Sequence, residues 1–406
     1  MRLLKFALAI IVGSFATSAL AQQTLDRPLD EPQDYHLDSG LLNNPAIDAQ
    51  TLFNNVITIK DAAWLRIYFS DVQLEADSFV RITSQLDKEV QELDADALAM
   101  WGNSSAYFNG NSLLVELVAA PGTTNRFIIN QIAMETEVAL PAGTCGICGP
   151  DDRVQSEEDW ACRLLPAGCT ASIWNNLSCL VSAGHCMGGD MVIQFNVPNS
   201  NGNCNINHPP VADQFPITNF LFTNGGVGND WAAMTSGTNN LNQTAYERFG
   251  QFRPIASSPP HLAQQLAIWG YGIDSQCSAS QTQQTSIGAV TSVSSTLFRH
   301  NVDATFGNSG SGIIQNGAIL GIATNCPCPN WATRVDHPNF VAAREQLCPT
   351  PPACPWDLDE SGSVGTSDLL ELFAQWGTAG AADFDESGTV NTADLLILFA
   401  NWGQCP

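Results

Sequence analysis

Basic residues are scarce in this chain. It has 15 Lys and Arg against 40 Asp and Glu, so its formal net charge is −25 at pH 7. Such a charge repels phosphates and argues against nucleic acid as a partner. No apolar run is long enough to span a membrane, and cysteine is absent before Cys145. The hydrophobic content of 44% is ordinary for a globular protein, and 406 residues suffice for two or three domains.

The first 21 residues have the pattern of a secretory signal. Arg2 and Lys5 precede an apolar stretch, and Ala19-Leu20-Ala21 offers a small-x-small cleavage site before Gln22. We therefore expect a secreted protein, extracellular or associated with the cell surface, whose cysteines form disulfides. Because 13 cysteines are an odd number, at least one must stay outside the intrachain bridges.

Residues 22–140 contain short strand-like runs separated by turn residues. The runs cover residues 63–69, 79–82, 113–118 and 126–129. Their spacing predicts a small β-sandwich, and this region has no plausible catalytic cluster. We interpret it as a propeptide or a retained accessory domain and prefer the propeptide, which would make the chain a zymogen. A hinge is expected at residues 140–143.

Three separated motifs carry the residues of a nucleophilic site. Ser309 lies in the glycine-rich stretch of residues 307–312, which suits the presentation of a hydroxyl and of backbone N–H groups. His185 ends an apolar, strand-like run, and Asp230 begins another. The order is His, Asp, Ser, with gaps of 230 − 185 = 45 and 309 − 230 = 79 residues. Subtilisins and α/β-hydrolases use other orders.

On these motifs, residues 145–348 resemble a trypsin-like serine endopeptidase of the chymotrypsin fold. The resemblance implies a mainly β architecture of two six-stranded barrels with a triad between them. It implies His185 as the base, Asp230 as its orienting acid and Ser309 as the nucleophile. It also implies an oxyanion hole from the N–H groups of Gly307 and Ser309. Cys169 and Cys186 correspond to the disulfide that brackets the family's histidine segment.

Other residues compete for the base and the acid. His300 is closer than His185 to Ser309 in sequence, but only His185 has the context of a strand, small residues and a following cysteine. Four further aspartates compete with Asp230: Asp190, Asp213, Asp274 and Asp303.

Specificity and activation are read from the same resemblance. Asp303 lies six residues before Ser309, where trypsins have the base of the primary pocket, so a preference for Arg or Lys is favoured. The alternative is a structural Asp, which some bacterial relatives carry here without a basic preference. Thr324 and Asn325 correspond to the strand that contacts substrate, and this strand lacks the histidine of glutamate-specific relatives. Asn308 replaces the Asp that pairs with a freed N-terminal amine in trypsins, so trypsin-type activation is not expected.

The remaining cysteines suggest bridges rather than metal sites. Cys145-x-x-Cys148 has zinc or redox spacing, but in an exported chain bridges to distant cysteines are favoured. Cys354 and Cys405 flank the last region and are expected to close it. Cys145 with Cys348 and Cys277 with Cys326 are further suggestions, because sequence alone leaves connectivity open.

After a proline-rich linker at residues 349–355, a loop-helix unit occurs twice at an offset of 383 − 357 = 26 residues. Each loop has oxygen ligands at calcium spacing and a glycine at the sixth position. The ligands expected are Asp357, Asp359, Ser361, Ser363 and Asp368, then Asp383, Asp385, Ser387, Thr389 and Asp394. Residues 356–406 thus resemble a type I dockerin, which implies a small all-α domain with structural Ca²⁺. It also implies a cohesin-type partner, tethering to the cell surface or docking within the chain. The simpler alternative is an acidic turn and helix without an ion.

These features together predict a secreted serine endopeptidase carrying a calcium-dependent docking module. No cofactor is expected for catalysis, and the substrate would be a protein or peptide. The alternative is a non-enzymatic secreted binding or adhesion protein built on a decayed protease barrel.

Overall fold

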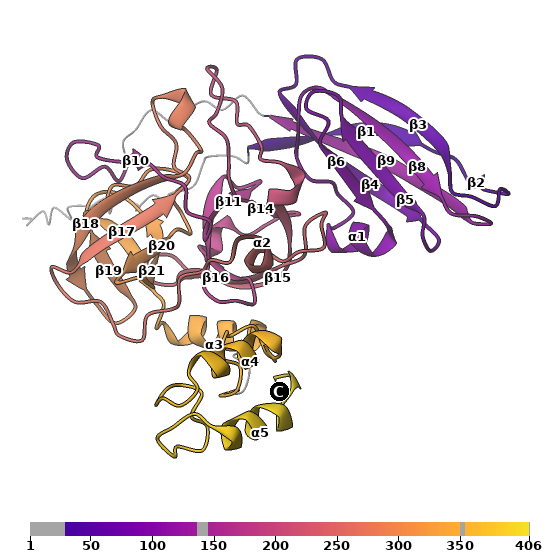
Figure 1. The fold of residues 1–406 in the computed structure, drawn as a ribbon. Coiled ribbons are helices and arrows are strands. Elements are labelled where there is room, and N and C mark those ends of the chain that lie inside the picture. Colours follow the sequence, from indigo (N-terminus) through magenta and orange to yellow (C-terminus); the bar gives the residue numbers. More distant parts are fainter. Residues whose placement is uncertain (1–28, 136–144, 350–353, 406) are drawn as a thin grey trace, which may run out of the picture.

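The computed structural model describes residues 29–135, 145–349 and 354–405. The expected signal peptide at residues 1–21 and the hinge at residues 140–143 lie outside the described residues, as does most of the linker. In chain order, the described parts form a pair of β-sheets, two β-barrels and a small helical module (Figure 1). Within these parts, no helix has the length and apolar character needed to cross a membrane.

Residues 29–135 form two antiparallel sheets that contribute to one hydrophobic core. The expected strand-like runs coincide with β4 (Trp64–Gln73), β5 (Phe79–Ser84), β8 (Ser112–Ala119) and β9 (Thr124–Glu135). In β5, alternate residues are buried, which is the period-2 pattern of a sheet with one face on a core. The first sheet contains β1 (Asp30–Asp38), β9 (Thr124–Glu135), β4 (Trp64–Gln73) and β7 (Phe108–Asn109), with β2 (Leu42–Asn43) paired to β9. The second contains β3 (Gln50–Thr58), β8 (Ser112–Ala119), β5 (Phe79–Ser84) and β6 (Val90–Leu93); the helix α1 (Ala95–Met100) follows β6.

The next region builds a closed six-stranded antiparallel barrel. Four of its strands are buried along their whole length, because neighbouring parts of the fold cover their outer faces: β11 (Ala161–Leu165), β12 (Cys169–Ile173), β13 (Cys179–Ser182) and β14 (Val192–Gln194). The strand order is β11 (Ala161–Leu165), β12 (Cys169–Ile173), β13 (Cys179–Ser182), β16 (Asp230–Ser236), β15 (Gln214–Asn224) and β14 (Val192–Gln194), which returns to β11. Short helical turns η1 (Gly184–Cys186) and η2 (Val211–Asp213) and the helix α2 (Ala245–Phe249) lie in its connections.

The second barrel closes in the same way. The strand order is β18 (Gln284–Val293), β17 (Gln265–Gly270), β20 (Gly312–Gln315), β21 (Ala318–Asn325), β22 (Asn330–Arg334) and β19 (Leu297–His300). Pairing of β19 with β18 completes the ring, and β10 (Val154–Gln155) adds to the outer edge of β18. The turn η3 (Cys277–Ala279) lies between β17 and β18. The expectation of a mainly β chain with two six-stranded barrels is confirmed.

The barrels pack against each other and share a helix. Ile314, Ile319 and Ile322 of the second barrel belong to the hydrophobic cluster of the first. The helix α3 (Pro338–Leu347) then returns to the first barrel, where Phe340 contacts Trp174 and Trp231 edge-on. Burying a phenylalanine contributes about 1.5–3 kcal/mol, so this one contact helps to hold the barrels in place.

The last module holds two short helices, α4 (Thr366–Ala374) and α5 (Thr392–Ala400). The expectation of an all-α module is incomplete, because β23 (Ser363–Val364) pairs with β24 (Gly403–Gln404) near the two ends of the module. Cys354 and Cys405 are bonded there, as expected.

Six disulfides are present among the described residues. Cys169–Cys186 forms as expected. The suggested pairs Cys145–Cys348 and Cys277–Cys326 are wrong. Cys145 and Cys148 instead lie beside the β21–β22 turn, which supplies their partners, and α3 carries Cys348 to the start of β13. The observed bridges are Cys145–Cys326, Cys148–Cys328, Cys179–Cys348 and Cys204–Cys277. Cys162 is free and buried.

The N-terminal sheets are joined to the first barrel by a buried contact. Leu165, Val192, Ile206 and Val211 of the barrel region belong to the hydrophobic cluster of the sheets. The backbone N–H and C=O of Tyr107 bond the side-chain amide of Gln214, at 3.0 and 2.8 Å. Removing residues 29–135 would therefore expose apolar surface and leave polar groups without their partners.

Candidate active site

His185 and Asp230 are brought together inside the first barrel. His185 lies on η1, directly after β13, and Asp230 is the first residue of β16. The close approach requires Gly184, because a Cβ there would lie 2.0 Å from the carbonyl oxygen of Thr223. Asp230 is fully buried; one carboxylate oxygen accepts the backbone N–H of His185 at 3.0 Å, and the other bonds His185 Nδ1.

Ser309 lies on the other side of the imidazole. Its Oγ is 2.8 Å from His185 Nε2. Because an ionised Asp230 only accepts, His185 Nδ1 must donate, and Nε2 is left to accept the serine proton. The structure thus places one hydrogen-bonded line from Asp230 through His185 to Ser309, which is the arrangement in which a histidine activates a hydroxyl.

The loop around Ser309 depends on two glycines. Gly307 and Gly310 have φ of +97° and +87°, and a Cβ at either position would collide with backbone carbonyls. Thr170 on β12 supports this loop: its hydroxyl donates to the Gly307 carbonyl at 2.9 Å, and its N–H donates to the Ser309 carbonyl at 2.8 Å. Within the described chain, no hydrogen bond engages the N–H groups of Gly307 and Ser309, the two expected oxyanion donors.

The disulfide Cys169–Cys186 links the two halves of this arrangement. Cys169 precedes Thr170, which supports the serine loop, and Cys186 follows His185. The bridge therefore connects the strand under the nucleophile to the turn that carries the base.

The competing residues lie elsewhere. His300 is buried in the second barrel with neither ring nitrogen hydrogen-bonded to any described residue, and burial lowers its pKa to about 3. Asp213 pairs with Arg248, and Asp274 pairs with Arg153. The backbone carbonyl of Asp190 accepts from Arg66 in the contact with the N-terminal sheets.

Asp303 has a different role from the one expected. Its two carboxylate oxygens accept the backbone N–H groups of Cys148, at 2.6 Å, and Asp152, at 3.0 Å. The side chain is buried against this incoming segment, and burial raises its pKa. A carboxylate engaged in this way does not offer a free charge to a basic substrate side chain, so the structure gives no basis for the expected basic pocket.

Thr324 and Asn325 end the strand β21, beside the serine loop. Gly310 N–H donates to the Ala323 carbonyl at 2.8 Å, which fixes β21 against the loop. Both residues are buried, and the Thr324 hydroxyl donates to the Trp331 carbonyl at 3.3 Å. The Thr324 hydroxyl is therefore already used within the fold, and contact of these two residues with substrate stays a prediction.

The two acidic loops have the same geometry. In each, oxygen atoms of three aspartates lie within 4.8 Å of one another, and the third aspartate is buried. Asp368 accepts the N–H groups of Leu358 and Asp359 at 2.7 and 3.2 Å, and Asp394 makes the same two bonds in the second loop at the same distances. The two sets are Asp357, Asp359 and Asp368, and Asp383, Asp385 and Asp394.

The hydroxyl positions of the loops complete an all-oxygen donor set. The Ser361 and Ser387 hydroxyls face the carbonyls of Ser363 and Thr389 at 3.1 and 3.3 Å. Burial raises the pKa of Asp357, whereas bonds from Ser387 lower that of Asp385. Residues 349–406 contain nine Asp and Glu and no Lys or Arg. Hard oxygen ligands without a protein counter-charge fit a bound Ca²⁺.

Sequence reasoning missed Thr170 and Arg153, which both support the serine loop. Thr170 gave a weak signal, because it follows the cysteine bonded to Cys186. Arg153 gave almost none, since it lies in a polar segment without periodicity. The sequence feature that could have drawn attention to Arg153 is that it is one of only 15 basic residues in an acidic chain.

Comparisons with known proteins add little to this geometry. No family model matches the chain, and no curated protein matches it. Among solved structures, it is similar to one titled "Structure of Glu endopeptidase in complex with MPD", with a TM-score of 0.40 and 18% identity. The match covers 49% of this chain and 98% of that one. A likeness of this size carries no argument about activity.

Proposed function

We propose that this chain is a secreted serine endopeptidase that cleaves peptide bonds through an acyl-enzyme. The observation that carries the proposal is the hydrogen-bonded line from Asp230 through His185 to Ser309 in the first barrel and at its boundary with the second. Two closed barrels and free backbone donors beside Ser309 support it.

In the proposed reaction, Ser309 Oγ attacks the scissile carbonyl while its proton passes to His185 Nε2. Asp230 holds Nδ1–H and stabilises the imidazolium that forms. The N–H groups of Gly307 and Ser309 would bind the oxyanion, each worth about 3 kcal/mol in the transition state. His185 then returns the proton to the leaving amine, and a water repeats the sequence to release the acid and restore Ser309.

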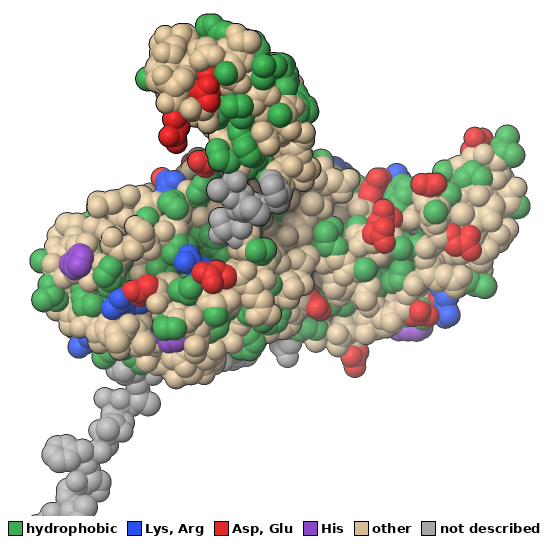
Figure 2. Space-filling view, turned by 90° about the horizontal axis from the view of Figure 1, so that it is seen from below, with side chains coloured by type: hydrophobic (Ala, Val, Ile, Leu, Met, Phe, Trp, Pro, Cys, Tyr) green, Lys and Arg blue, Asp and Glu red, His purple; other side chains and the backbone are tan. Residues whose placement is uncertain are grey.

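The last module would hold two structural Ca²⁺ ions and dock to a cohesin-type partner. The exposed apolar side chains repeat at the 26-residue offset. They are Leu370, Phe373 and Trp376 on one unit and Leu396, Phe399 and Trp402 on the other, each 42–64% exposed. Figure 2 displays hydrophobic side chains gathered on this module, which projects from the barrels. Secretion through residues 1–21 remains part of the proposal, and the disulfides agree with it.

The N-terminal sheets are better explained as a retained accessory domain, a small sandwich, than as a propeptide. Their removal would expose Leu165 and Val192 of the first barrel. Intact mass of the mature protein separates the two interpretations.

The test is labelling of the purified protein with a fluorophosphonate, comparing the wild type with Ser309→Ala. One adduct, mapped to Ser309 and lost in the variant, is expected. Absence of any adduct in both intact and proteolysed protein would refute the peptidase and favour the alternative, a non-enzymatic binding protein on a decayed barrel.

A further inference from the structure

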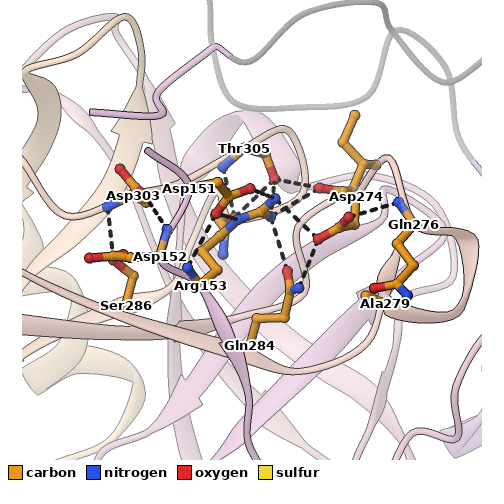
Figure 3. Close-up of polar contacts among 12 residues, drawn as sticks. Asp151, Asp152, Arg153, Asp274, Gln276, Ala279, Gln284, Ser286, Asp303 and Thr305 are labelled. Carbon is orange, nitrogen blue, oxygen red and sulfur yellow. Dashed lines mark hydrogen bonds and ion pairs between the residues drawn. The ribbon is translucent and has the colours of Figure 1, made fainter. Parts of the chain in front are cut away.

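Arg153 occupies a buried position directly under the serine loop. Its side chain is 5% exposed. One terminal nitrogen, Nη1, lies 3.0 Å from each of three acceptors: the Ile273 carbonyl, Gln284 Oε1 and Thr305 Oγ1 (Figure 3). The other nitrogen, Nη2, pairs with Asp151 at 2.8 Å and Asp274 at 3.3 Å.

Thr305 connects Arg153 to the nucleophile. The Thr305 hydroxyl accepts from Arg153 and donates to the Ile273 carbonyl at 2.8 Å. Its N–H donates to Asn308 Oδ1 at 2.9 Å, and Asn308 N–H donates back to the Thr305 carbonyl at 3.0 Å. The turn closed by this pair contains Gly307 and leads directly into Ser309.

The segment that carries Arg153 is attached to the second barrel by hydrogen bonds and disulfides rather than through a chain terminus. Asp303 accepts two of its backbone N–H groups, from Cys148 and Asp152. The disulfides Cys145–Cys326 and Cys148–Cys328 fix its start beside β21 and β22. The Gly146 carbonyl also accepts from the N–H of Ala304, at 3.2 Å. The guanidinium is therefore delivered to the turn from within the chain.

We propose that Arg153 is a positioning residue that holds the Thr305–Ser309 turn, and with it the oxyanion donors, in the catalytic arrangement. The cation enters on a segment that is bonded to the second barrel, and it reaches Asn308 through Thr305. The inference rests on the proposed peptidase function. It follows that the chain is competent without cleavage upstream of Cys145.

The chemistry of the site favours arginine specifically. Its planar fork presents donors to the turn and to two carboxylates at once, whereas a lysine ammonium has one nitrogen for all these partners. Arg153→Lys should therefore restore only part of the function that Arg153→Gln removes.

The experiment measures the rate of fluorophosphonate labelling at Ser309 together with the intact mass of the labelled species. For Arg153→Gln we expect the limiting rate at saturating probe to fall by up to about 100-fold, the cost that a misplacement of the reacting groups by about 1 Å can reach. The fraction of protein finally labelled should stay near one. Misfolding would instead lower that fraction without changing the rate of the remainder.

Two further variants complete the test. Thr305→Val removes the acceptor and leaves both ion pairs of Arg153, so it should lower the rate similarly even where Arg153→Gln folds poorly. Arg248→Gln is the matched control, because it also removes an Arg–Asp pair, on α2 of the first barrel. It should label within about 2-fold of wild type, since this pair is not bonded to the serine loop and Asp213 keeps a hydrogen bond from Asn196.

The outcomes separate the inference from the function on which it rests. Labelling of Arg153→Gln and Thr305→Val at the wild-type rate would overturn the inference and leave the peptidase standing. The same holds if the wild type labels only in species cleaved upstream of Cys145. A wild type that labels in no form would overturn the peptidase and the inference together.

Discussion

Replacing Thr170 with valine should damage both the stability and the activity of the barrels. The Thr170 hydroxyl is fully buried; it donates to the Gly307 carbonyl at 2.9 Å and accepts the N–H of Tyr271 at 2.9 Å. Valine has nearly the same shape but offers neither bond. Each group left buried without a partner costs about 1–3 kcal/mol, so the free energy of unfolding should fall by about 2–6 kcal/mol.

Thr170→Ser is the control, because it keeps the hydroxyl and loses one methyl group, worth about 0.8 kcal/mol. Denaturant unfolding followed by tryptophan fluorescence measures stability, and the fluorophosphonate rate at Ser309 reports on the loop. We expect the valine variant to be less stable than the serine variant and slower to label. If the two variants unfold within about 0.5 kcal/mol of each other, these hydrogen bonds do not support the loop as argued.

Three further predictions concern the acid, the calcium loops and a buried histidine. Asp230→Asn should lower the maximal labelling rate about 10⁴-fold while the fold persists, because the amide favours the wrong imidazole tautomer; a loss under 10-fold would contradict the role of Asp230. Calorimetric titration should find two Ca²⁺ bound per wild-type chain and one bound to the Asp368→Asn variant or to the Asp394→Asn variant. The control variant Glu371→Gln changes an exposed side chain and should still bind two. If all four proteins bind the same number of ions, the two loops are not the calcium sites. Burial lowers the pKa of His300 to about 3 in the folded protein, against about 6.5 in the unfolded chain. Between pH 6.5 and pH 3 the unfolded chain therefore binds one more proton than the folded protein. The free energy of unfolding should fall as the pH falls through this window. His300→Leu should flatten this dependence by up to about 1.4 kcal/mol per pH unit, and an unchanged slope in denaturant titrations would contradict the argument.

Features with a local or repeated signal could be predicted from the sequence. The acidic loops repeat in register, so their common geometry follows from the chemistry of one copy. The chain order of His185, Asp230 and Ser309 suggested a triad, and the structure brings these residues into one hydrogen-bonded line. The small residues before the histidine and the glycines around the serine gave a local signal, although the close contacts that require Gly184, Gly307 and Gly310 come from distant segments.

Features that depend on contacts between distant parts of the chain could not be predicted from the sequence. The role of Asp303 is set by Cys148 and Asp152, about 150 residues earlier, and no local pattern encodes that contact. The same is true of Arg153, whose acceptors come from three separate segments. The disulfide partners of Cys145 and Cys148 are likewise set by the fold, which places the turn between β21 and β22 beside the segment that carries Arg153.

The long disulfides also set an order of events during synthesis. Cys145 and Cys148 are bonded to residues 181 and 180 positions later, and Cys179 to one 169 positions later. At about 5–20 residues per second, a ribosome needs roughly 10 to 35 seconds to make the intervening chain. The segment that carries Arg153 is therefore among the first parts of the double barrel to be synthesised and among the last to be fixed by disulfides. Until then, Cys145 and Cys148 remain open to wrong partners, and an oxidant arriving before the second barrel would trap the chain in a misbonded form.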